Sequence, residues 1–247
     1  CCMHGKEIVM GMYGYGFFDP TYILVIIGLI ITLIASGNVK ATFAKFNKVL
    51  SRRGLTGADA ARKILDANGL YNVRIEHVAG NLSDHFDPRN SVIRLSDSTY
   101  NSTSVAAIGV AAHECGHAVQ HQVGYVPIKV RNGIVPFVNI CNYASLPLII
   151  IGMIMGSRGY NIAMLGVILF CAVLVFQIVT LPTEFNASSR ALKTLEGMNM
   201  LDSDELTGAR KVLGAAAMTY VAAVASTALQ VLRLFLIVQN SSDRRRR

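Results

Sequence analysis

Four long apolar runs constrain the fold of this chain more than any other feature. Each is close to the roughly 20 residues that an α-helix needs to cross the hydrocarbon core of a membrane. Only 15% of all residues are charged and the mean hydropathy is +0.44, which is too apolar for a typical soluble domain of 247 residues. The sequence therefore predicts a mainly α integral membrane protein with about four transmembrane helices. The runs are "PTYILVIIGLIITLIAS" (20–36), "IVPFVNICNYASLPLIIIGMIMG" (134–156), "NIAMLGVILFCAVLVFQIVTLP" (161–182) and "LGAAAMTYVAAVASTALQVLRLFLIV" (213–238).

The segments between these runs divide the chain into parts. Only "SRGY" separates the second run from the third, which predicts a helical hairpin, and the small residues of the fourth run predict packing against neighbouring helices. The predicted parts are an N-terminal extension (1–16), a first transmembrane helix (17–37), a polar domain (38–132), a transmembrane hairpin (133–182), a polar helical segment (183–211), a fourth transmembrane helix (213–238) and a basic tail (239–247).

The positive charges of the chain lie mainly in its two polar segments. Twelve of the 23 Lys and Arg residues fall within 38–132 and four more within 183–211. Because Lys and Arg accumulate on the cytoplasmic side of membrane proteins, both segments are expected in the cytoplasm. The final "DRRRR" departs from this rule, so either the fourth run does not fully cross or the tail is an exception. This asymmetry, with attraction to anionic lipid, accounts for the net charge of +8, and no nucleic-acid partner is expected.

The polar domain is predicted to combine helices and strands. It opens with the basic amphipathic segment "NVKATFAKFNKVLSRRG", which either lies on the inner membrane surface or packs on the domain as a solvated helix. In "TGADAARKILDANG", Thr56 and Asp59 have the spacing of a capping box and Gly69 is a helix stop. The segment "YNVRIEHVAGNLSDHFDPRNSVIRLSD" predicts short strands around turns, and "SVIRLS" is a candidate edge for strand addition by an extended substrate.

A helix predicted over 102–124 carries the motif "HECGH". Its spacing of four residues puts His113 and His117 on one face, so both imidazoles can reach a single zinc ion. Glu114 can then act on a water molecule at the zinc without being a ligand itself. The alternative is a pair of core histidines held by hydrogen bonds. Two buried histidines beside a buried glutamate are costly without a metal or another partner, which favours zinc.

A catalytic zinc usually has three protein ligands and one open position, so a third ligand is expected. His121 is excluded, because it lies two turns beyond His113, roughly 12 Å along a continuous helix. The five cysteines form no CxxC pair, so they are not expected to bind zinc. Glu184 in "LPTEFNASSRAL" follows the third run on the side of the HECGH helix. Pro182 and Thr183 are expected to start a new helix there, so capping of that helix is the alternative role of Glu184.

Several of these segments together resemble a known family. "SDHFDPRNSVIRLSDSTYNSTSVAAIGVAAHECGHAVQH", "LPTEFNASSRAL" and "TYVAA" are similar to the YugP-type membrane zinc metallopeptidases, and the resemblance covers the chain from about residue 17 onward. It implies a prokaryotic integral membrane metalloprotease related in general scheme to the HtpX-like gluzincins. By this resemblance His113, His117 and Glu184 are the zinc ligands and Glu114 is the catalytic glutamate. Related gluzincins usually carry an acidic residue four positions after the ligand glutamate, where this chain has Ser188.

The expected function is a membrane-embedded zinc-dependent endopeptidase with a cytoplasmic α+β zincin-like domain in a prokaryotic plasma membrane. Glu114 acts as the general base, and His85 in "SDHFDP" is the candidate donor to the oxyanion, with Asp84 and Asp87 ordering its loop. A turn-stabilising role is the alternative for His85. The expected partners are zinc, a protein or peptide substrate and the lipid bilayer, while the oligomeric state is not predicted. The alternative function is a proteolytically inactive metal-binding scaffold or chaperone-like protein. A transporter is disfavoured, because Arg233 is the one ionisable group in the runs.

Overall fold

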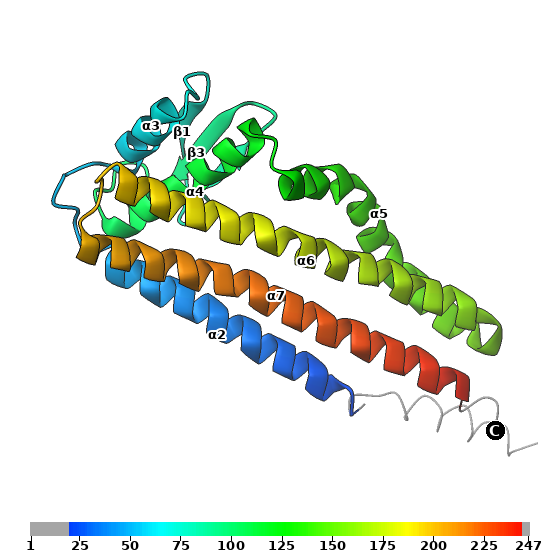
Figure 1. Ribbon diagram of the computed structural model, residues 1–247. Helices are drawn as coiled ribbons and strands as arrows, with labels where there is room; N and C mark the ends of the chain where they lie inside the picture. The colour runs from blue at the N-terminus through cyan, green and yellow to red at the C-terminus, as the bar shows by residue number, and fades with distance from the viewer. Residues whose placement is uncertain (1–19, 244–247) are drawn as a thin grey trace, which may run out of the picture. The chain divides into compact units, whose positions relative to one another are not determined.

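The computed structural model describes residues 20–243, and most of them are helical (Figure 1). Four helices are long and apolar enough to cross a membrane, in agreement with the sequence prediction. They are α2 (Tyr22–Phe46), α5 (Val126–Ile154), α6 (Tyr160–Gly197) and α7 (Ser203–Asp243). The other elements are α3 (Gly57–Ala67), β1 (Arg74–Val78), β2 (His85–Asp87), β3 (Val92–Ser96), α4 (Val105–Gln122) and the 3-10 helix η1 (Gly156–Gly159). The predicted N-terminal extension and the end of the basic tail lie outside the described residues.

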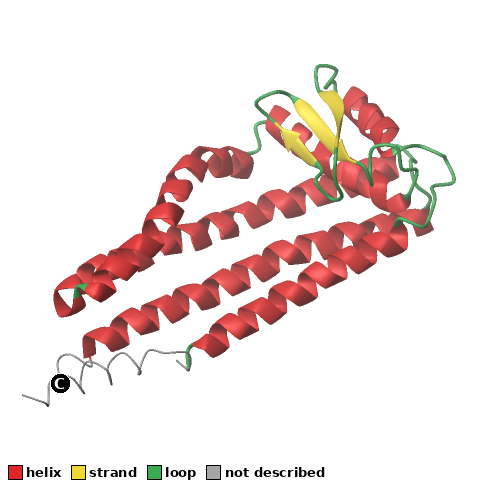
Figure 2. Ribbon diagram, turned by 180° about the vertical axis from the view of Figure 1, so that it is seen from behind, coloured by secondary structure: helices red, strands yellow, loops and turns green. Residues whose placement is uncertain are grey.

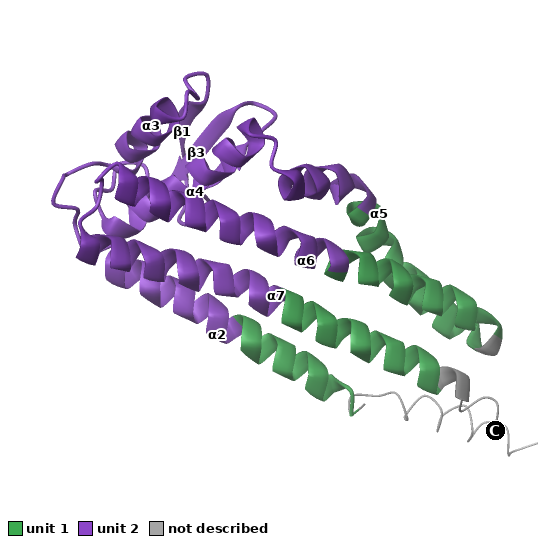
Figure 3. Ribbon diagram, viewed as in Figure 1, with its two compact units in different colours: residues 1–32, 138–174, 224–247 green, residues 33–137, 175–223 purple. Residues whose placement is uncertain are grey.

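The chain divides into two compact units (Figure 3). The first contains residues 1–32, 138–174 and 224–247, and its described part is helical. Within it, a side chain at Gly28 of α2 would come within 2.8 Å of the Ser226 hydroxyl of α7, so these two helices approach closely. This contact agrees with the prediction that the small residues of the fourth run pack against a neighbour. Arg233, which interrupts that run, lies with its guanidinium 4.2 Å from the centre of the Tyr22 ring.

The second unit contains residues 33–137 and 175–223 and includes a three-stranded mixed sheet. Strand β3 lies in the middle, parallel to β1 and antiparallel to β2, with α3 and α4 beside the sheet (Figure 2). The prediction that "SVIRLS" provides an edge is therefore wrong, because β3 is paired on both sides. Four of its five residues are buried, which is typical of an interior strand. The edges of the sheet are β1 and β2.

Local signals predicted the ends of α3 and α4 correctly. Thr56 caps α3, and the Thr56 hydroxyl and the Asp59 carboxylate form the reciprocal bonds of a capping box. Gly69 and Gly124, expected to stop α3 and α4, follow these helices with positive φ values of 69° and 65°. Ser104 caps α4 by accepting a hydrogen bond from the backbone N–H of Ala107. The motif helix therefore begins and ends close to where the sequence placed it.

The basic segment after the first run does not form a separate helix. Helix α2 continues through Phe46, and the following residues form turns and a bridge between Leu50 and Ser104. Phe43 is buried in a cluster with Ala106 and Val212, and Phe46 packs against the same cluster. This packing holds the end of the helix on the domain, which agrees with the second of the two predicted alternatives.

The predicted helix start at Pro182 is also wrong, because α6 runs without a break from Tyr160 to Gly197. Pro182 removes one backbone donor, but the apolar run before it and the packed segment after it both favour a helix. Ala187, Ala191 and Leu195 are buried at the four-residue spacing of one helix face. Glu184 consequently lies well inside α6, and its alternative role as an N-terminal cap is excluded.

Candidate metal centre

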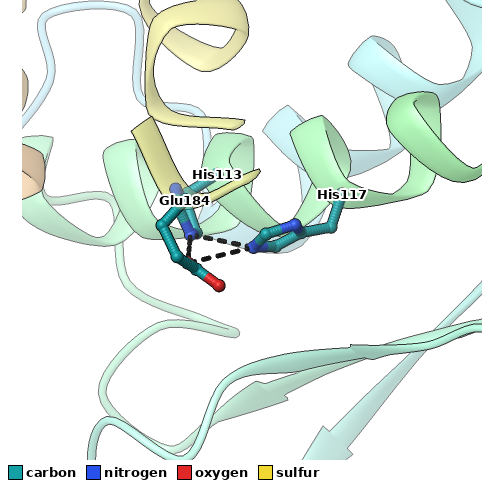
Figure 4. A group of neighbouring side chains, drawn as sticks. All are labelled: His113, His117 and Glu184. Atoms are coloured by element: carbon teal, nitrogen blue, oxygen red, sulfur yellow. Dashed lines mark hydrogen bonds and ion pairs between the residues drawn. The ribbon is translucent and has the colours of Figure 1, made fainter. Parts of the chain in front are cut away.

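The structure brings together the three residues predicted as zinc ligands (Figure 4). The Nε2 atoms of His113 and His117 lie 3.1 Å apart, and each lies 3.4 Å from Oε2 of Glu184. Among residues 20–243, these three form the only group of three or more His, Cys, Asp or Glu side chains whose ligand atoms converge in this way. His121 is not part of the group, and its ring contacts Phe86 instead.

The convergence depends on a close approach of α4 and α6. Gly116 lies between the two histidines of the motif, and a Cβ atom there would come within 2.7 Å of the Ala187 carbonyl oxygen. Glycine therefore allows the two helix backbones to meet. Glu184 precedes Ala187 by almost one turn, so the same contact brings its carboxylate to the histidine face of α4. Its side chain is almost completely buried there, with 2% of the residue exposed.

Gln120 orients the ring of His117. The Gln120 amide nitrogen donates to the Thr183 carbonyl at 2.8 Å and to Oδ1 of Asn186 at 2.9 Å. A carbonyl can only accept, so the amide nitrogen must face Thr183 and the amide oxygen must face Nδ1 of His117, 3.1 Å away. Nδ1 of His117 therefore carries the hydrogen and donates it to Gln120. The lone pair of Nε2 remains available toward Glu184, which is the tautomer that a metal ligand needs.

Ser188 holds the other histidine. Its hydroxyl lies 3.1 Å from Nδ1 of His113 and comes from α6, one turn after Glu184. The gluzincins with which the sequence was compared usually have a carboxylate at this position, and here a hydroxyl occupies it. Nδ1 of His113 can donate to this oxygen, which leaves Nε2 facing Glu184 and His117. Both imidazoles are thus arranged with Nε2 as the free atom.

The charge distribution of the centre favours a cation. Oε2 of Glu184 is buried and has no hydrogen-bond partner among the described residues, although two imidazole nitrogens face it. Burial lowers the pKa of His117, but the carboxylates of Glu184 and Glu114 outweigh this effect and leave the pKa raised above its ordinary value. A divalent cation would satisfy the carboxylate and both nitrogens together. Two histidines with one glutamate are a donor set that catalytic zinc uses, so these residues fit zinc.

Two cavities meet at this centre. One has a volume of about 280 Å³ and the other about 230 Å³. Five residues line both of them, namely Asp84, His113, Glu114, Glu184 and Tyr220. The centre is therefore accessible from both cavities, as a catalytic metal with an open position requires. Glu114, next to the first histidine, is mostly buried but contributes to both walls.

His85 lines the larger cavity, but both of its ring nitrogens have protein partners. Nδ1 lies 2.9 Å from the Ser83 carbonyl oxygen, to which it donates, and Nε2 lies 3.4 Å from a guanidinium nitrogen of Arg94. A neutral His85 with these partners has no N–H left for a substrate. The loop itself is ordered by Asp84 and Asp87, as expected. Asp84 accepts from the backbone and hydroxyl of Ser96.

Asp87 closes the turn that follows β2. Its carboxylate accepts from the Asn90 side chain at 2.8 Å and from Arg94 at 3.1 Å. These bonds, chiefly the one from Asn90, lower the pKa of Asp87 to about 2 despite the opposing effect of desolvation. The charged carboxylate thereby fixes the ends of β2 and β3 at neutral pH.

The sequence did not single out three other residues of the site. Tyr220 of α7 lines both cavities, and Arg131 of α5 lies with a guanidinium nitrogen 3.7 Å from Oε1 of Glu184. Gln120 is the third. Gln120 lies in the predicted motif helix, where no spacing rule indicated a partner for His117, and Arg131 and Tyr220 lie in segments without a metal-binding motif. One feature of the sequence could have indicated Tyr220, namely a single tyrosine among the small residues of the stretch "TYVAA".

Comparison with known proteins gives the family. Residues 21–239 match the family described as "Putative neutral zinc metallopeptidase". The chain belongs to this family. It is also 45% identical over 220 residues to "Putative membrane protease YugP" of Bacillus subtilis (strain 168), a match that covers 89% of this chain and 97% of that protein. No solved structure matches the chain. The family confirms the resemblance noted in the sequence, and its description agrees with the donor set of the centre.

Proposed function

We propose that this protein is a membrane-embedded zinc-dependent endopeptidase of the HExxH, gluzincin-like type. The observation that carries the proposal is the convergence of His113, His117 and Glu184 where two cavities meet, with Glu114 beside them. When bound there, zinc lowers the pKa of a water molecule toward about 7 and polarises the scissile carbonyl. The chain supplies the ligands, the base and the cavities that receive the substrate on both sides of the scissile bond.

Glu114 is the general base in this proposal. It takes a proton from the attacking water and passes it to the amine of the leaving peptide. Its position supports this role, since it neighbours a ligand in the sequence, is mostly buried and lines both cavities without belonging to the converging group of ligand atoms.

The developing oxyanion needs a hydrogen-bond donor. His85 was the candidate from the sequence, but its nitrogens face Ser83 and Arg94. Tyr220 is the alternative, because this residue lines both cavities together with Glu184 and Glu114 and its phenol can donate one hydrogen bond. We therefore assign the donor role to Tyr220 and a loop-stabilising role to His85. Tyr220→Phe then lowers kcat strongly, by about 10²–10³-fold, while His85→Gln changes it little.

The proposed location is a prokaryotic plasma membrane, with the centre on the cytoplasmic side. Three observations support it: the four candidate spans, the excess of Lys and Arg in residues 38–132 and 183–211, and the membrane protease named in Bacillus subtilis. The proposed substrates are proteins or peptides. Cysteine labelling of single-cysteine variants from either side of the membrane tests the orientation, and labelling of residues in 38–132 from outside contradicts it.

The decisive experiment measures zinc content and cleavage on the same detergent-purified samples, with casein and a membrane protein as substrates. We expect about one zinc per chain in the wild type, loss of zinc in Glu184→Ala, and loss of cleavage with retention of zinc in Glu114→Gln. Glu196→Ala is the matched control, because Glu196 is an exposed glutamate of the same helix. Full zinc retention in Glu184→Ala contradicts the third ligand. Zinc binding without any cleavage that depends on Glu114 supports the alternative, an inactive metal-binding scaffold.

A further inference from the structure

The smaller of the two cavities at the centre has an apolar interior. Helices α4, α6 and α7 supply most of its wall. We name it the apolar cavity after its lining residues Val39, Leu82, Val110, Leu213, Ala216 and Ala217. The ionisable residues that line it are the five it shares with the larger cavity. Its charge is therefore concentrated where the metal ligands lie, and the rest of the wall is uncharged.

The two remaining polar residues of this wall already have partners. The Thr219 hydroxyl donates to the Ala216 carbonyl at 2.6 Å, and Ser188 faces Nδ1 of His113. A charged or strongly polar substrate group placed there would lose its hydration without compensating hydrogen bonds, which is unfavourable. An apolar group has no hydrogen bonds to water to lose, and its transfer out of water lowers the free energy. The lining thus selects for apolar groups.

The volume of the apolar cavity limits the size of the substrate side chain that it can hold. The apolar cavity has about 230 Å³, and a protein cavity of about 150 Å³ is large enough to hold benzene. One side chain of the size of leucine or phenylalanine fits. The larger cavity differs in character, because its wall includes the polar residues His85, Arg131 and Asn132, which do not line the apolar cavity. The two cavities therefore favour different kinds of side chain on the two sides of the scissile bond.

We propose that the apolar cavity is the subsite for the side chain adjacent to the scissile bond, and that it selects a leucine- or phenylalanine-sized apolar residue. This inference rests on the proposed peptidase function and adds a substrate class to it. Ala216 and Val110 line the subsite from α7 and α4. Neither is a ligand or the base, so their substitution changes the choice of substrate and leaves the metal centre intact.

The test is to map cleavage sites by mass spectrometry after digestion of unfolded casein by the full-length, zinc-loaded protein in detergent. For the wild type, one position flanking the cleaved bond is expected to be occupied by Leu, Phe, Ile or Met, with cleavage at least about tenfold faster than at Ala. Ala216→Leu fills the cavity and shifts this position toward Ala and Gly. Val110→Ala enlarges it and shifts the position toward Phe and Tyr. Met218→Ala is the control, because Met218 is exposed on the same helix.

The outcomes separate this inference from the function on which it rests. Cleavage that depends on Glu114 but shows no apolar preference overturns the subsite and keeps the peptidase. The same is true of a preference that is identical in the wild type, Ala216→Leu and Val110→Ala. Absence of any cleavage that depends on Glu114 overturns the peptidase and the subsite together. The two variants change the cavity in opposite directions, so a fold defect in one does not remove the test.

Discussion

Replacing Gln120 by leucine tests the link between tertiary structure and metal affinity most directly. The leucine side chain is similar in size but makes no hydrogen bond, so it removes the acceptor of the His117 Nδ1 hydrogen and the donor to the Thr183 carbonyl. Gln120 is fully buried, and water does not readily replace these bonds. The His117 ring then loses both its fixed orientation and its fixed tautomer.

The expected loss follows from the role of such partners. Removing the group that orients a metal-binding histidine typically lowers metal affinity by about 10–100-fold, which corresponds to about 1.4–2.7 kcal/mol. The buried N–H of His117, which loses its acceptor, costs a further ~1–3 kcal/mol of the free energy of unfolding. We therefore expect Gln120→Leu to weaken zinc binding strongly and to lower thermal stability, while the helical fold remains.

The assay is competition for zinc between the detergent-purified protein and a fluorescent chelator of known affinity, with thermal unfolding followed on the same samples. Gln122→Leu is the matched control, because it makes the same substitution at an exposed position two residues further along α4. A zinc dissociation constant of Gln120→Leu within twofold of the wild-type value would falsify the orienting role of Gln120.

Three further predictions concern the same unit. Gly116→Ala is expected to lower both zinc affinity and the melting temperature, because its Cβ would lie 2.7 Å from the Ala187 carbonyl oxygen. The control is Gly214→Ala, which has open space around it and stabilises α7 by up to about 1 kcal/mol. Equal effects of the two variants in chelator competition and thermal unfolding contradict the close approach of α4 and α6. Because the pKa of His117 is raised, protons compete with zinc for this ligand up to a higher pH than they do for a free histidine. The apparent zinc affinity therefore falls as the pH drops through and below that pKa. An apparent zinc affinity that does not change between about pH 8 and 5 contradicts this prediction. Burial raises the pKa of the Cys115 thiol, so alkylation followed by mass spectrometry should modify it only after unfolding.

Local patterns in the sequence were sufficient to predict much of the fold. The capping box at Thr56, the glycine stops at Gly69 and Gly124, and the length of the apolar runs each depend on residues within a few positions of one another. The same is true of His113 and His117, whose spacing of four puts them on one face of any α-helix. Glu184 was found from its place after an apolar run and from the resemblance to a known family.

The tertiary structure determined what depends on distant partners. Whether α6 continues through Pro182 depends on the core that packs against the residues after it, and whether β3 is an edge depends on two other strands. The tautomer of His117 depends on a hydrogen bond between Gln120 and Thr183, which are 63 residues apart. Tyr220 reaches the centre only because α7 lies beside it. The sequence by itself therefore determined the helices and the candidate ligands, because these follow from local spacing. The orientation of the ligands, the position of Tyr220 beside the centre and the apolar cavity arise only when separate helices are packed together.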